Sequence, residues 1–439
     1  MSRAQGRRME VRVGSGRAAV LGVMVVGLAF AMLTLSGTSP RGIGREVQSA
    51  SRVSLDQRVF SCGGGISGAA VRSGSVIDGL SPSRAVSSTP VPVVADKAVA
   101  TGAFAGQQAS SKRSLAWLPC PEAQASWWFV AAGGAPITHD TVLTLTNPRP
   151  GPATVDIDVY GPKGRVDSPG LHGITIAAQS TQTVDLGSAA PTVGDLAVSV
   201  VAQRGLIAAS ATDRFAPGAV GKNVFEWLPP QTVPSTSVTL AGIPISRGAS
   251  TLVVVNPGQV DAIVNVGVIG ATGTFTPKAL TGFTIAPNSV VSLPLSAVID
   301  GTPLALQLTS QQPITATVRS TKAGDISFAT GVRPIRGGTA FAVPNGSGQL
   351  VLSSLGAGAT VTVVAFDAHG KHLLNSPVKV GAHVSVAVPF PAGTTYVQLI
   401  AGPVDIVAGF AVDGPHGTAS AGITPAKSSI ELPNVRPGL

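Results

Sequence analysis

The chain has 439 residues, of which 44% are apolar and only 12% are charged. This composition excludes a disordered polar chain, because disorder accompanies low hydrophobicity and high net charge. Glycine and proline are abundant, at 53 and 34 residues, but they follow no triplet repeat, which excludes collagen. Both residues disfavour helix interiors. The composition therefore predicts an all-β protein with many turns and two to four domains, at roughly 100–200 residues per domain.

The net charge of +9 is unevenly distributed along the chain. Residues 1–45 contain seven arginines and one glutamate, so most of the positive charge lies there and the remainder is close to neutral. A nucleic-acid-binding protein should carry a basic face interleaved with aromatic side chains. Aromatic residues are scarce and no basic cluster lies near them, so no nucleic-acid partner is expected.

The first predicted element is a membrane helix near the N-terminus. Residues 18–35 carry no charge, and five arginines precede them. A run of this length is near the lower limit for a spanning helix, and the positive-inside rule keeps the N-terminus in the cytoplasm. We expect an uncleaved signal-anchor over residues 18–36, which makes a single-pass cell-membrane protein. The alternative is a signal peptide cleaved after Ser36; both place the chain from about residue 40 outside the cytoplasm.

The two cysteines fit that compartment. Cys62 lies in the segment FSCGGG and Cys120 in WLPCPE. An even cysteine count outside the cytoplasm predicts one disulfide, here closing a loop of about 58 residues. The alternative is a pair of unrelated buried thiols. A metal site is not expected, because two isolated cysteines without a nearby histidine cannot complete a tetrahedral shell.

Beyond the cysteines, the sequence repeats after 109 residues. The segment 143–148 (LTLTNP) corresponds to 252–257 (LVVVNP), and the alternating strand 153–159 corresponds to 262–268. Alternation of apolar and polar residues indicates half-buried strands. The alignment pairs three apolar positions across the two copies: Val155 with Val264, Ile176 with Ile285, and Leu186 with Leu295. All of these residues are therefore predicted to face a core.

A third, shorter copy begins near residue 349, and each copy ends on a similar strand. That closing strand also occurs once earlier, as LAWLPC at 115–120, which indicates a degenerate leading unit. The predicted fold class is all-β, with tandem immunoglobulin-like β-sandwich repeats behind one N-terminal transmembrane helix. The predicted parts are a cytoplasmic basic N-terminus (1–17), the anchor (18–36), the leading β unit (46–120), three sandwich repeats (121–230, 231–334 and 335–425) and a C-terminal tail (426–439).

Several of these segments resemble an uncharacterised actinobacterial envelope family, membrane-anchored and named for a domain of unknown function (number 5719). The resemblance rests on the anchor, the two cysteine segments, the stretch SWWFVAAGG at 126–134, and the Asn-Pro strand ends at 147–148 and 256–257. The resemblance implies an extracytoplasmic β-rich protein and supplies no activity.

Candidate chemistry is sparse. Trp127 and Trp128 are adjacent on a predicted strand, so one should point inward and the other outward, where it could stack on a sugar ring or a partner. The alternative is that the two tryptophan side chains pack at the junction with the preceding unit. The pairs Asp156/Asp158 and His369/His372 provide too few ligands for a metal.

Nucleophile and phosphate-loop motifs are also incomplete, because Ala69 replaces the last glycine of a Gly-x-Ser-x-Gly pattern and Asn223 follows Gly221-Lys222. We therefore predict no catalytic, cofactor-binding or metal-binding residues. The expected function is a non-catalytic structural or interaction protein of the bacterial cell envelope, with an envelope protein or polysaccharide as partner.

Two alternatives remain open. The first is a carbohydrate-binding accessory protein in envelope glycan assembly, which exposed aromatic side chains would favour. The second is an enzyme with its site at a repeat junction. A cluster of His, Asp, Glu or Ser side chains converging from two units would favour that function.

Overall fold

The computed structural model describes residues 51–54, 57–76, 79–81, 84–85, 91–96, 102–216, 223–245, 249–296, 298, 301–425 and 429–432. The chain divides into two compact units, Ser54–Ile430 and a smaller one made of Met1–Val53 with Glu431–Leu439. Strands β1 (Ser51–Ser54) and β33 (Ser429–Leu432) form a two-stranded sheet. The predicted anchor over residues 18–36 lies outside the described residues, and within the described ones no helix has the length and apolar character needed to span a membrane.

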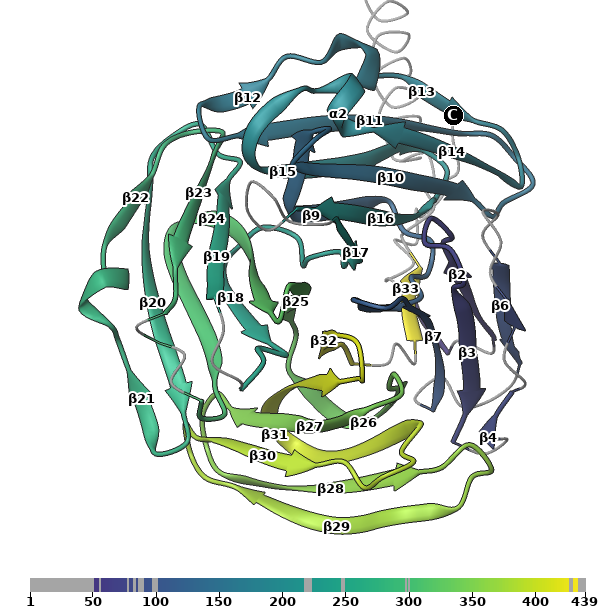
Figure 1. Ribbon diagram of the computed structural model, residues 1–439, viewed down its shortest axis with the longest axis vertical. Helices are drawn as coiled ribbons and strands as arrows, with labels where there is room; N and C mark the ends of the chain where they lie inside the picture. Colours follow the sequence, from purple (N-terminus) through teal and green to yellow (C-terminus); the bar gives the residue numbers. More distant parts are fainter. Residues whose placement is uncertain are drawn as a thin grey trace, which may run out of the picture. The chain divides into compact units, whose positions relative to one another are not determined.

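The unit Ser54–Ile430 is all-β, as predicted, and its strands follow one another in four groups (Figure 1). The first group comprises β2 (Gln57–Cys62), β3 (Ala70–Ser75), β4 (Gly79–Leu80), β5 (Arg84–Ala85), β6 (Val91–Asp96), β7 (Ala103–Ser110) and β8 (Leu115–Pro119). The second comprises β9 (Ser126–Ala135), β10 (His139–Asn147), β11 (Ala153–Gly161), β12 (Gly164–Val166), β13 (Ile174–Ile176), β14 (Ser180–Asp185), β15 (Thr192–Arg204), β16 (Ala208–Phe215) and β17 (Val224–Leu228), with the short helices η1 (Pro169–Leu171) and α2 (Leu186–Ala189).

The third and fourth groups are laid out in the same order. The third comprises β18 (Ser235–Ala241), β19 (Ala249–Asn256), β20 (Ala262–Gly270), β21 (Gly273–Phe275), β22 (Phe283–Ile285), β23 (Ser289–Pro294), β24 (Ala305–Lys322) and β25 (Asp325–Val332), with the short helix η2 (Lys278–Leu280). The fourth comprises β26 (Ile335–Ala342), β27 (Ser347–Ser354), β28 (Ala359–Phe366), β29 (His372–Val380), β30 (Ser385–Pro389), β31 (Tyr396–Asp413) and β32 (Thr418–Ile423).

The last three groups share one pattern of strand pairing. In the second group, β15 joins β9 to β11, and β16 joins β17 to β10, whose other neighbour is β14. In the third, β24 pairs with β18 and β20 through its first half and with β19 and β25 through its second half. In the fourth, β31 does the same with β26 and β28, then with β27 and β32. One continuous strand in each of these two groups thus replaces the pair β15 and β16.

The paired core positions confirm the 109-residue repeat. The six side chains predicted to face the cores are all buried, namely Val155, Val264, Ile176, Ile285, Leu186 and Leu295. The turns after β11 and β20 are also equivalent, because Gly164 and Gly273 both have positive φ, at 117° and 142°. Residues with a side chain rarely adopt such a backbone, so glycine at these two positions favours the same hairpin in both copies. The predicted domain boundaries themselves stay predictions.

The first group shares its apolar core residues with two other groups. Its residues Phe104, Leu115 and Trp117 belong to the core of the fourth group, and Phe104 stacks on Tyr396 with ring centroids 5.1 Å apart. Its remaining apolar residues, including Cys62, form a small cluster with Trp227 of the second group. The first group therefore packs against both the second and the last groups, which are far apart in the sequence.

The last strand of each group lies innermost. Figure 1 shows β17, β25 and β32 at the centre of this unit, and β8 contacts both β17 and β32. β25 in turn contacts β17 and β32, so the four strands form a closed set of neighbours, which we call the central strands. The architecture is therefore a closed arrangement of four groups.

The repeat register predicts opposite effects for two neighbouring substitutions on β20. Val264 is fully buried, whereas Ile263 is 57% exposed on the other face of the same strand. Val264→Asp should lower the free energy of unfolding by more than about 3 kcal/mol, because it buries an unpaired charge. Ile263→Asp, the matched control, should cost less than about 1 kcal/mol. Denaturant unfolding of the full chain measures both, and equal costs would contradict the assigned register.

Candidate functional site

The two cysteines form the predicted disulfide. Cys62 and Cys120 are bonded, with Cα atoms 4.7 Å apart, and both are buried. The bond fixes the glycine-rich loop that follows β2 against the second group. A Cβ on Gly63 would lie 2.1 Å from Ser210 Oγ, and Trp227 Nε1 donates to Gly64 O at 3.2 Å. The glycines after Cys62 thus permit a close approach that no larger residue would allow.

Trp127 and Trp128 are both on β9, and both are buried, at 4% and 7% exposure. Trp127 Nε1 donates to Ile207 O at 3.0 Å, and Trp128 stacks on Tyr160 with ring centroids 5.6 Å apart. The expectation that one ring faces outward is wrong, because the strand lies between the core and neighbouring segments and both faces are covered. Ligand contact at Trp127 and Trp128 stays a prediction, and neither ring is exposed to solvent in support of it.

The pair Asp156 and Asp158 holds local structure together. Asp156 Oδ1 accepts a hydrogen bond from Gly173 N at 2.7 Å, and Asp158 forms an ion pair with Arg165. One repeat later, Asn265 accepts the equivalent bond from Gly282 N at 2.9 Å. An uncharged amide therefore serves the same role as Asp156, which favours a structural role for that carboxylate.

The Asn-Pro strand ends also have matching structural roles. Asn147 Nδ2 donates to Gly151 O and to the carbonyl oxygens of residues 176 and 177. Asn256 donates to Val260 O and to the carbonyl oxygens of residues 285 and 286, exactly one repeat further on. Each amide thus donates to three carbonyl groups where the chain turns between strands, and one of the three belongs to a buried isoleucine, Ile176 or Ile285.

The most unusual chemistry lies among the central strands. Glu226 on β17 is buried, and its Oε1 accepts hydrogen bonds from the backbone N–H groups of Trp117 on β8 (2.9 Å) and Trp227 (2.8 Å). Asp325 begins β25, and its Oδ2 accepts from the N–H groups of Leu115 on β8 (3.0 Å) and Thr418 on β32 (2.9 Å). These two carboxyls therefore link strands from all four groups.

Both carboxyls have displaced pKa values. Burial, with added repulsion from Asp325, raises the pKa of Glu226 well above its usual value, although the two N–H donors oppose that rise. Burial likewise raises the pKa of Asp325 to about 7 against the effect of its own backbone donors. Both groups therefore favour the protonated form far more than exposed carboxyls do.

A second cluster lies between the second and third groups. Asp195 on β15 is buried and forms an ion pair with Arg319 on β24, and Ser292 Oγ donates to it at 2.6 Å. Burial raises the pKa of Asp195, but the charge and hydrogen bonds of Arg319 outweigh that effect and lower it overall. The Asp195–Arg319 ion pair thus joins the second and third groups through a contact from which most solvent is excluded.

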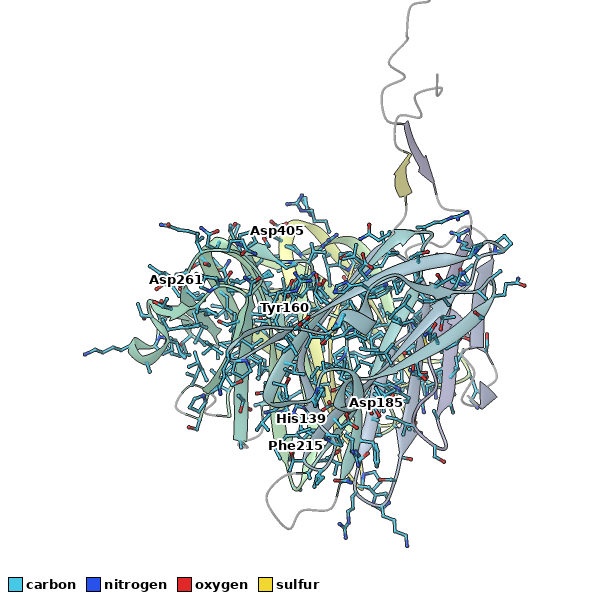
Figure 2. All side chains as sticks on the ribbon, turned by 90° about the horizontal axis from the view of Figure 1, so that it is seen from above. His139, Tyr160, Asp185, Phe215, Asp261 and Asp405 are labelled. Carbon is cyan, nitrogen blue, oxygen red and sulfur yellow. A yellow bond between two sulfur atoms is a disulfide. The ribbon has the colours of Figure 1, made fainter. Side chains whose placement is uncertain are left out.

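The neighbouring His139 joins this cluster to the central strands. Its Nε2 lies 3.1 Å from both carboxylate oxygens of Asp213, and its ring meets Phe215 edge-on at 5.1 Å (Figure 2). Asp213 is fully buried and lies opposite Glu226 in the pairing of β16 with β17. The sequence therefore brings histidine, aspartate and glutamate side chains together from distant positions.

Sequence reasoning missed these residues because each acid is isolated along the chain. One signal was present: Glu226 stands in the closing strand FEWLPP, where the equivalent residue of LAWLPC is Ala116. An acid in an otherwise apolar closing strand indicates a special partner. In the part of the chain that the structure describes, no group of His, Cys, Asp or Glu side chains is suited to hold a metal ion.

Comparison with known proteins identifies one family. A model described as a family of unknown function (DUF5719) matches residues 81–391, about seven-tenths of the chain. No curated protein matches the chain.

The disulfide predicts a measurable contribution to stability. Replacing both Cys62 and Cys120 by serine should lower the free energy of unfolding by about 3–4 kcal/mol, because the unfolded chain loses a closed loop of 58 residues. Denaturant unfolding of the full chain measures this change. Thiols that react in the unfolded, unreduced parent protein would contradict the bond.

Because the Asp195–Arg319 pair is buried, we expect replacement of Arg319 to destabilise the protein more than replacement of the exposed Arg336. Arg319→Met should cost about 3 kcal/mol, because it leaves the Asp195 carboxylate buried beside an uncharged side chain. Arg336→Met is the matched control, since Arg336 pairs with Asp405 at the exposed surface and its loss should scarcely change the unfolding midpoint. Equal effects of the two substitutions would refute a structural role for the buried pair.

Proposed function

The chain belongs to the family of unknown function DUF5719, and on that premise we propose that it is a non-catalytic structural or interaction protein of the actinobacterial cell envelope. Residues 18–36 anchor it in the cell membrane as a single-pass signal-anchor. The β-rich part lies outside the cytoplasm and binds an envelope protein or polysaccharide.

The observation that best supports this proposed location is the buried Cys62–Cys120 disulfide. Structural disulfides persist in oxidising compartments and are rare in the cytoplasm. The bond also fixes the glycine-rich loop on which the contact between the first and second groups depends. A reducing compartment would weaken that contact, which supports an extracytoplasmic location.

Two further features support a binding role over catalysis. The buried carboxyls of Glu226 and Asp325 accept hydrogen bonds from backbone N–H groups of neighbouring strands, which is a structural task. Large apolar side chains are meanwhile exposed on the third group, including Ile263 and Phe275, each more than half exposed. Exposed apolar surface is typical of sites that bind other molecules.

We further propose that the last three groups are diverged immunoglobulin-like sandwiches. In the second group, β12 and β13 both pair with β11, so we count them together as its fourth strand. The pairing of β10 with β14 and of β11 with β15 then joins the second strand to the fifth and the third to the sixth, as in immunoglobulin domains.

A second candidate function is an enzyme with its site at a group junction. The observation in its favour is the convergence of His139, Asp213 and Asp195 with Arg319 from two groups. Each of these side chains is occupied by another, so we favour the binding role.

Complementation of a deletion strain separates the two functions. We expect Ser292→Ala and Asp213→Asn variants that fold and localise normally to restore envelope function, because no reaction depends on them. The double variant Ile263→Asp/Phe275→Asp should fold but fail to retain cross-linked envelope partners. Loss of function in a folded Asp213→Asn variant, with partner binding intact, would favour the enzyme.

A further inference from the structure

Several backbone N–H groups of the central strands donate hydrogen bonds to side chains of neighbouring groups and not to a paired strand. Among the described strands, the residue-by-residue registers of β8, β17 and β32 are with β7, β16 and β31, so at least part of the other edge of each strand has no strand partner. These edges are buried, and buried backbone N–H groups need acceptors. Glu226 and Asp325 provide four such acceptor contacts, and Thr330 Oγ1 provides another to Gly422 N at 3.1 Å.

Among the described residues, no basic side chain forms an ion pair with either carboxyl. Lys112, Arg113 and His416 are close in sequence to Leu115 and Thr418, whose N–H groups donate to Asp325. Glu226 is faced by Asp325 and Asp213, and otherwise by backbone donors. Lys322 lies opposite Asp325 in the β24–β25 pairing, but its Nζ binds Asp413 at 2.9 Å. Arg319 on β24 and His139 on β10 bind Asp195 and Asp213 instead.

A second observation comes from unpaired polar atoms in the same place. Asp325 is 1% exposed, and its Oδ1 has no hydrogen-bond partner. The buried hydroxyls of Ser327 on β25 and of Thr418 and Ser420 on β32 also lack partners. A carboxylate oxygen can only accept hydrogen bonds, whereas a protonated one can also donate to hydroxyl oxygens. Protonation would therefore both remove an unbalanced charge and provide a donor.

We propose that Glu226 and Asp325 carry protons when the central strands are packed together, and that loss of these protons loosens the contacts joining the four groups. We call the contacts among β8, β17, β25 and β32 the seam. Acidic conditions favour the packed state of these strands, and a rise in pH favours their separation.

The direction of the pH effect follows from proton linkage. Because the pKa of Asp325 is raised to about 7 in the folded protein, the folded state binds its proton more tightly than the unfolded state does. The stabilising effect is complete below the ordinary carboxyl pKa. It is lost as pH rises from about 4 through about 7, and the raised pKa of Glu226 acts in the same direction.

Native-state hydrogen exchange of the full chain between pH 5 and 9 tests the seam. After correction for intrinsic exchange, the opening constants of peptides from β8, β25 and β32 should rise with pH below about pH 7, by up to tenfold per pH unit for each proton released on opening. Asp325→Asn keeps an acceptor for Leu115 N and Thr418 N but cannot ionise, so its opening constant at pH 8 should be at least tenfold below that of the parent. The exposed Asp261→Asn variant, the control, should follow the parent profile.

Glu226→Gln provides an independent variant should Asn at position 325 prevent folding, and it should also reduce the pH dependence. An opening constant in the parent that is flat or falls with rising pH would overturn the proposal. So would an Asp325→Asn or Glu226→Gln variant that keeps the parent's full pH dependence. Each readout concerns opening of the central strands alone, so it is independent of partner binding in the envelope.

Discussion

The structure depends on satisfying buried strand edges at the centre of its large unit. An open sheet ends in edge strands, and an exposed edge invites pairing with other chains. Here β8 lies against both β17 and β32, and most residues of the three strands are buried, so backbone N–H groups at these contacts need acceptors from the protein. Carboxyl and hydroxyl oxygens of adjacent groups accept these hydrogen bonds. Each group is therefore incomplete without its neighbours, and the four are bound into one compact unit.

Side-chain size at the central strands follows the same logic. The contact between Thr330 on β25 and Gly422 on β32 is an example. A Cβ on Gly422 would lie 2.2 Å from Thr330 Oγ1, so a larger residue there would displace the hydroxyl that satisfies this edge.

Much of the fold was predictable from the sequence because it depends on short-range patterns. Alternation in 153–159 and 262–268 predicted the buried faces of Val155 and Val264, and the even cysteine count predicted the Cys62–Cys120 bond. The central acids were not predictable, because Glu226 and Asp325 meet only through the packing of whole groups. The error on Trp127 and Trp128 had the same origin: alternation separates two faces but does not say whether a neighbouring group covers the second one.

The continuous strands β24 and β31 have a consequence for how the chain can tolerate changes in length. Each extends for 18 residues and pairs with different strands through its first and second halves. An inserted residue near the middle would therefore shift the pairing of one half relative to the other. In the second group, residues 205–207 separate β15 from β16, and Gly205 there has a φ of 79°. That short break can absorb an insertion as a longer loop. Of the three sandwich-like groups, the second is therefore the one in which evolution or engineering can most easily add residues between the two sheets.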